Sequence, residues 1–163
     1  MTDSTSRAAE FAAHLRRELR TLVLGTVSAE GVPDASVAAA VVEEDGTLIV
    51  YVSGLAAHTR NLRETGRASA LLAEDESAAT QPLARRRLTL ACTAAVVPRN
   101  DASFADIVAR FRARFGATID VLVTLPDFAF FRLTPQSGRL VLGFGQAFEL
   151  EPHTWTVTSR VTR

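Results

Sequence analysis

The sequence contains no lysine, and all eighteen basic residues among its 163 residues are arginine. Reactions that need a lysine amine, Schiff-base chemistry included, are therefore excluded. An anionic ligand must be bound by guanidinium, backbone N–H or hydroxyl groups instead. Because eighteen acidic residues balance the arginines, the net charge favours neither nucleic acid nor a membrane surface as a partner.

Cysteine and long apolar runs are also scarce. The single cysteine, Cys92, has no partner for an intramolecular disulfide and lies in the apolar run LTLACTAAVV. We expect it to be a buried spectator, and one cysteine suits a reducing compartment. No apolar run approaches the roughly 18 residues that span a bilayer, and the N-terminus lacks the apolar core of a signal peptide. The sequence therefore predicts a cytoplasmic protein with no membrane partner.

Several catalytic motifs are absent. The three histidines, His14, His58 and His153, form no H-x-x-H or H-E-x-x-H pair, so a zinc hydrolase is not expected and no metal site is predicted. There is no G-x-S-x-G nucleophile elbow. The stretch GFGQAF has Phe148 where a dinucleotide-binding loop needs its third glycine, which excludes that kind of site.

Apolar and turn residues alternate in a pattern typical of short strands. We expect strands at residues 21–28, 34–42, 47–53, 68–74, 87–97, 128–135 and 139–150. Ser6 is expected to cap an N-terminal helix that carries Phe11, Leu15 and Leu19 on one face. A brief helix is expected at 58–66, and another, capped by Asp101, over about 101–116.

Short strands with helices at the margins favour a mainly β fold, a small antiparallel barrel, because closing the sheet removes exposed edges. No linker or internal repeat divides the chain. We therefore expect one domain over 1–163, with a helix at 1–20, the barrel at 21–150 and a C-terminal tail at 151–163.

Two glycines interrupt the last expected strand. Gly143 and Gly145 flank Phe144, and glycine inside a strand gives up packing. Either the barrel needs a bulge there, or something must approach the backbone closely, such as a neighbouring chain or a flat ligand. Both interpretations stay open at this point.

Six segments occur in an order that resembles a known family: GVPDAS, HTRNL, EDES, ARRRLTL, RFGATIDVLVTLPDFAFFRL and GRLVLGFGQAF. The chain resembles the pyridoxamine 5'-phosphate oxidase-like, FMN-binding split-barrel family, and within it the haem-utilisation branch. The resemblance covers most of residues 19–150. It implies a homodimeric split β-barrel with two equivalent sites for a planar anionic cofactor, haem or FMN, at the subunit interface.

The resemblance also implies the residues of the site. Flavin-using relatives tend to place Ser, Arg and Lys where this chain has Ala56, Ala57 and His58, so much of the usual grip on the FMN phosphate is missing. The cofactor-binding residues implied are Ser53, His58, Thr59, Arg60, Asn61, Arg87, Gly143, Phe144, Gly145 and Gln146. The catalytic candidates are Arg87, which would face the cofactor, and Asp127, which resembles the acid that orients an iron-bound histidine in haem-degrading relatives.

Three functions follow as hypotheses. The first is a haem-utilisation protein that degrades or transfers haem, the second is an FMN-dependent oxidoreductase, and the third is a cofactor-free binding or regulatory dimer. In the family the iron-bound histidine comes from a C-terminal extension. Here we expect it to be absent or displaced, and we expect His153 to be an exposed tail residue more than an iron ligand. Whether the protein is an enzyme stays open.

Overall fold

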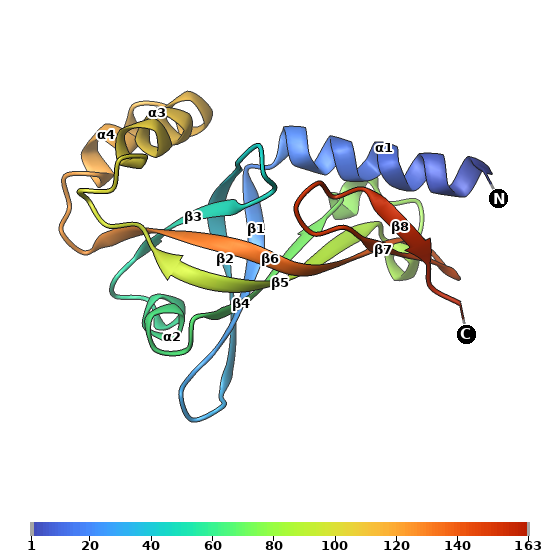
Figure 1. Cartoon of the computed structure of the whole chain (residues 1–163), viewed down its shortest axis with the longest axis horizontal. Coiled ribbons are helices and arrows are strands. Elements are labelled where there is room, and N and C mark those ends of the chain that lie inside the picture. Colours follow the sequence, from blue (N-terminus) through green and yellow to red (C-terminus); the bar gives the residue numbers. More distant parts are fainter. Residues whose placement is uncertain (1, 163) are drawn as a thin grey trace.

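The computed structural model describes residues 2–162. It contains an antiparallel sheet with the strand order β3-β2-β1-β4-β5-β6-β7-β8, and β3 also pairs with β6. This additional pairing closes the first six strands of that order into a barrel, and β7 and β8 extend it at one end (Figure 1). The prediction of a mainly β, antiparallel barrel with peripheral helices is confirmed.

The strands are β1 (Thr21–Val27), β2 (Pro33–Val42), β3 (Leu48–Ser53), β4 (Arg67–Ala73), β5 (Arg87–Val96), β6 (Phe128–Gly143), β7 (Gln146–Leu150) and β8 (Val157–Arg160). The helices are α1 (Thr2–Glu18), α2 (Ala57–Thr65), α3 (Phe104–Phe115) and α4 (Thr118–Leu122), and two 3₁₀ turns are η1 (Glu76–Ala78) and η2 (Pro82–Ala84). Among residues 2–162, no helix is long and apolar enough to cross a membrane.

Alternation of side chains builds the barrel interior. In β5, for example, Leu88, Leu90 and Cys92 point inward and are buried, while the intervening Thr89 and Ala91 are exposed. The α1 helix lies across the barrel (Figure 1) and buries Phe11 and Leu15 in the same core. Cys92 is buried, as predicted, and burial raises the pKa of its thiol to about 12.

A second apolar cluster lies outside the barrel, under α3 and α4. Phe111 and Ile107 of α3 pack on Tyr51 of β3 and Phe130 of β6, and the last two rings stack with centroids 4.1 Å apart. The predicted helix over about 101–116 corresponds to α3, but α4 was not predicted. Asp101 is not the N-cap: its Oδ1 accepts the N–H of Ser103, which is the N-cap residue.

Three other element predictions were wrong. Ser6 lies inside α1, which begins at Thr2. A break between two strands is expected at 136–138, yet β6 runs through these residues, because its pairing with β5 continues past a bulge between Ala91 and Cys92. The strand expected over 139–150 is broken by a chain reversal at Phe144 and Gly145, since Gly143 pairs directly with Gln146. Part of the C-terminal tail, Val157–Arg160, forms β8, which pairs with β7.

Candidate functional site

The expected site residues fall into two groups at opposite ends of β6. The Asp127 group consists of Ser53, His58, Thr59, Arg60, Asn61 and Asp127, and the hairpin group consists of Arg87, Gly143, Phe144, Gly145 and Gln146. Asp127 directly precedes β6 and Gly143 ends it. Sixteen residues of extended chain span roughly 50 Å when straight. Figure 1 accordingly has α2 and the β7–β8 end on opposite sides of the barrel.

The hairpin group surrounds a cavity of about 820 Å³, hereafter the hairpin cavity. Its lining comes from η2, β5, the β6–β7 hairpin and the end of β8: Leu83, Arg87, Val141, Gly143, Phe144, Gly145, Gln146, Ala147, Arg160, Val161 and Thr162. Gly145 adopts φ 65°, which glycine reaches without a steric cost. The glycines therefore serve a tight hairpin turn, and that turn presents Phe144 to solvent with 70% of its surface exposed.

The charged residues that line the hairpin cavity, Arg87 and Arg160, are both positive. Arg87 donates from Nη1 to the carbonyl oxygen of Arg85 (2.9 Å), and Arg160 donates from Nη2 to that of Gly145 (2.8 Å). Within residues 2–162, neither guanidinium has a carboxylate partner, and no acidic residue lines the cavity. Nearby Arg139, by contrast, pairs with Glu149 at 2.8 Å. The cavity therefore carries two unneutralised positive charges between apolar walls.

The Asp127 group centres on a close backbone approach. Gly54 donates its N–H to the carbonyl oxygen of Asp127 at 2.5 Å, and a Cβ on Gly54 would lie 2.7 Å from that oxygen. The Asp127 carboxylate itself is weakly held: Oδ2 lies 3.4 Å from Ser53 Oγ. In the part of the chain that the structure describes, it forms no ion pair, so it remains free to accept a hydrogen bond.

Some residues of α2 are buried and hold the helix on the barrel, and others are exposed. Thr59 and Asn61 are buried: Thr59 Oγ1 donates to the carbonyl oxygen of Ser53, and Asn61 Nδ2 donates to Thr26 Oγ1 at 3.0 Å. They fix α2 to β3 and β1. Arg60 is exposed, and His58 Nδ1 lies 2.8 Å from Ser36 Oγ. Burial lowers the pKa of His58, although the Asp34 carboxylate opposes this, and burial therefore favours the neutral imidazole.

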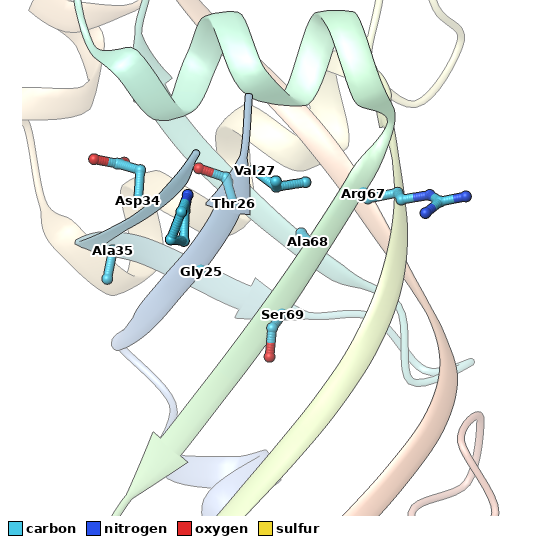
Figure 2. A pocket seen from close by; sticks show the side chains of 9 residues that line it. Gly25, Thr26, Val27, Asp34, Ala35, Arg67, Ala68 and Ser69 are labelled. Carbon is cyan, nitrogen blue, oxygen red and sulfur yellow. The ribbon is translucent and has the colours of Figure 1, made fainter. Parts of the chain in front are cut away.

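A second cavity, of about 650 Å³, was not predicted. It lies on the outer face of the barrel beside α2 and is lined by Gly25, Thr26, Val27, Pro33, Asp34, Ala35, Arg67, Ala68 and Ser69. Figure 2 labels all of these residues except Pro33 and shows the labelled ones on β1, β2 and β4. The signal that could have revealed it is the small size of outward-facing residues on adjacent strands, since Gly25 pairs with both Ala35 and Ser69.

His153 belongs to neither group. It packs on the turn between β2 and β3, where a Cβ on Gly46 would meet the His153 carbonyl oxygen. Arg16 also approaches this oxygen, with Nη1 at 3.4 Å. Among residues 2–162, no three His, Cys, Asp or Glu side chains gather as a metal site would require.

The chain matches the family model described as pyridoxamine 5'-phosphate oxidase over residues 8–142. It is 42% identical to "Heme oxygenase HutZ" of Vibrio cholerae over 135 residues, which are 83% of this chain and 76% of that protein. A crystal structure of HutZ, described there as a heme storage protein, superposes with a TM-score of 0.77 at 38% identity, covering 83% of this chain and 94% of the other.

The structure of Campylobacter jejuni ChuZ gives a TM-score of 0.82 at 27% identity and covers 94% of this chain and 62% of ChuZ. The family match, the sequence identity and the superpositions agree on one assignment. The chain belongs to the pyridoxamine 5'-phosphate oxidase family, as its sequence resemblance predicted.

Proposed function

We propose that this chain is a haem-utilisation protein that forms a homodimer and binds haem between its two copies. The observation that carries the proposal is the hairpin cavity, in which apolar side chains form the walls and neither Arg87 nor Arg160 has a carboxylate partner among residues 2–162. The similarity to HutZ, which is named a heme oxygenase and described as a heme storage protein, supports the same function.

Haem fits the chemistry of this cavity. It is a flat apolar ring with two carboxylates on one edge, and the cavity offers apolar walls together with guanidinium groups that bind carboxylates in a fork geometry. The volume, about 820 Å³, lies within the range of roughly 300–1,000 Å³ typical of small-molecule sites. Phe144, which is 70% exposed, offers a ring that a planar ligand can cover.

FMN is the alternative cofactor within the family. One observation favours it: the first turn of α2 has Ala56 as its N-cap, with no side-chain hydrogen bond, so backbone N–H groups remain available to a phosphate. Against it, Ala56 and Ala57 provide no side-chain donor for a doubly charged group. We therefore treat FMN binding as a competing outcome of the same experiment.

The need for a second copy follows from the length of β6. One chain holds Asp127 and the hairpin group at opposite ends of this sixteen-residue strand, too far apart to touch a single ligand. Two copies packed against each other would allow the Asp127 group of one to meet the hairpin group of the other. The outer barrel face supports such packing, because the cross-strand partners Val23 and Val37 are 39% and 69% exposed there.

In this assembly the residues have distinct tasks. Haem iron, when bound, supplies the redox or oxygen chemistry. Arg87 would bind a carboxylate of the ring, and the apolar walls would exclude water. The weakly held Asp127 carboxylate would accept a hydrogen bond at Oδ2 and so fix the orientation of its donor.

Titration of the purified protein with haemin, and separately with FMN, tests the proposal. We expect a Soret band that shifts and saturates at one haem per subunit, and a sedimenting species of twice the chain mass. Arg87→Ala should weaken haem binding roughly tenfold, the value of one charge-assisted hydrogen bond. A response to FMN alone, or to neither ligand, would overturn haem binding. Loss of the Soret band with a reductant and oxygen would separate degradation from storage.

A further inference from the structure

We infer that Arg160, on the C-terminal strand β8, is a second carboxylate-binding residue of the hairpin cavity, and that it makes the site selective for planar ligands with two carboxylates. The inference rests on the proposed function, because it names a further residue and the ligand class of the same site. Neither β8 nor Arg160 was expected from the sequence to take part in the site.

Pairing of β8 with β7 brings Arg160 to the cavity. Arg160 lies opposite Phe148, and one residue later the N–H of Val161 donates to the carbonyl oxygen of Ala147 at 2.8 Å. The Arg160 side chain reaches along β7 to the hairpin turn, where Nη2 donates to the carbonyl oxygen of Gly145 at 2.8 Å. The backbone and the side chain of Arg160 therefore both hold it beside the glycines.

This single bond leaves most of the guanidinium free. Arginine has five N–H donors in a planar fork, and within residues 2–162 only Nη2 of Arg160 has a hydrogen-bond partner. The bond to Gly145 fixes the orientation of the fork, so that binding an anion costs little further side-chain entropy. A carboxylate in the cavity could accept two of the remaining donors side by side.

The charge of the hairpin cavity explains why its ligand should have two carboxylates. Arg87 and Arg160 line the same cavity with no acidic residue among its lining. Two unneutralised like charges at the rim of an apolar cavity repel each other when water leaves, unless the ligand brings an equal negative charge. A ligand with one carboxylate neutralises half of this charge, whereas a ring with two carboxylates neutralises all of it.

The shape and polarity of the cavity restrict the ligand further. Leu83, Phe144 and Val161 are 79%, 70% and 36% exposed, and all three belong to the lining. They offer apolar surface to the body of the ligand while the two arginines bind its edge. The ligand class is therefore a broad apolar ring with two carboxylates, as in an iron tetrapyrrole.

Titrations in which either the Arg160 guanidinium is replaced or the ligand carboxylates are blocked test the inference. Arg160→Gln, Arg160→Lys and the unchanged protein are each titrated with haemin and with haemin dimethyl ester, whose carboxylates are blocked. Arg110→Gln on α3 is the control for loss of one positive charge, because Arg110 is exposed and forms no ion pair within residues 2–162. We expect Arg160→Gln to weaken haemin binding roughly tenfold and to leave ester binding unchanged. Arg160→Lys should lose less than Arg160→Gln, and Arg110→Gln should match the unchanged protein.

The outcomes separate the two proposals. If the unchanged protein binds haemin and Arg160→Gln binds it equally well, the role of Arg160 is overturned and haem binding stands. If Arg160→Gln weakens haemin and ester equally, Arg160 only braces the hairpin, which also overturns the inference. If Arg160→Gln does not fold, Arg160→Lys and the haemin-to-ester ratio of the unchanged protein decide: equal affinities contradict a carboxylate contact. An unchanged protein that binds neither ligand would remove the proposed function itself.

Discussion

At Gly54 the chain leaving β3 meets the chain entering β6 with no room for a side chain. A Cβ there would lie 2.7 Å from the Asp127 carbonyl oxygen. We expect Gly54→Ala to force the two segments apart and to lower the free energy of unfolding by about 1–3 kcal/mol, measured by urea denaturation. Gly25→Ala is the control, because its Cβ would be in ordinary contact, 3.4 Å from Ser69 Cβ. Equal losses in both variants would contradict the steric argument.

The Cys92 thiol is expected to be inert in the folded protein. Burial raises its pKa to about 12, so at pH 8 almost none of it is the reactive thiolate. A thiol reagent such as 5,5′-dithiobis(2-nitrobenzoic acid) should therefore not label the native protein, and should label one thiol per chain in denaturant. Rapid labelling of native protein would show that β5 opens easily.

His58 is expected to make stability depend on pH. Burial lowers its pKa below the usual 6.5, so the unfolded chain binds a proton that the folded chain resists. Above about pH 6.5, His58 does not lower the free energy of unfolding. As the pH falls from there through the lowered pKa, the proton bound by the unfolded chain lowers the free energy of unfolding. We expect His58→Gln to flatten the fall in stability below pH 6.5, measured by denaturation at a series of pH values. His14→Gln, at an exposed position on α1, should keep the original slope.

At the scale of elements, substitutions in the β6–β7 hairpin should distinguish residues that bind ligand from residues that stabilise the fold. Phe144 is 70% exposed at its tip, so Phe144→Ala removes little buried surface and should change the free energy of unfolding by less than about 0.5 kcal/mol. The same change should weaken haem binding roughly fivefold to tenfold, because a ring contact is lost. Phe148→Ala is the contrasting variant: this side chain is fully buried, and its loss should cost about 3–5 kcal/mol.

Prediction from the sequence succeeded where local pattern and tertiary structure agree. In β5, alternating Leu88, Leu90 and Cys92 were sufficient. It failed in β6, because Pro135 and Gly138 are typical of a turn. The structure keeps β6 continuous there through its neighbouring strands, because Gly138 pairs with Leu90 of β5 on one side and with Leu150 of β7 on the other. It also failed for β8, whose mostly exposed residues carry no apolar alternation.

The same reason limits what could be predicted of the site. The hairpin group was named from segments that lie close in sequence or resemble a family, and Arg87 and Gly143 do line one cavity. Leu83 and Arg160 were missed because η2 and β8 reach that cavity only through tertiary packing. No local pattern in VTSR indicates that its arginine ends beside Gly145.

At the scale of the whole molecule, the outer face of β1 and β2 is expected to be the contact between copies. Val37 is 69% exposed there, so Val37→Glu would bury a charge in the proposed interface without disturbing the core. We expect this variant to sediment as a monomer and to lose haem binding. Val121→Glu is the matched control, since Val121 on α4 is 63% exposed on another part of the surface. A dimeric Val37→Glu protein would place the interface elsewhere.

The continuous β6 strand has a consequence for such a pair. In each copy, one end of β6 would contact the first ligand and the other end would contact the second ligand. The two β6 strands of the pair would therefore connect both ligands. Both sites of the pair would therefore be built from the same two strands, and neither site could form in a single copy.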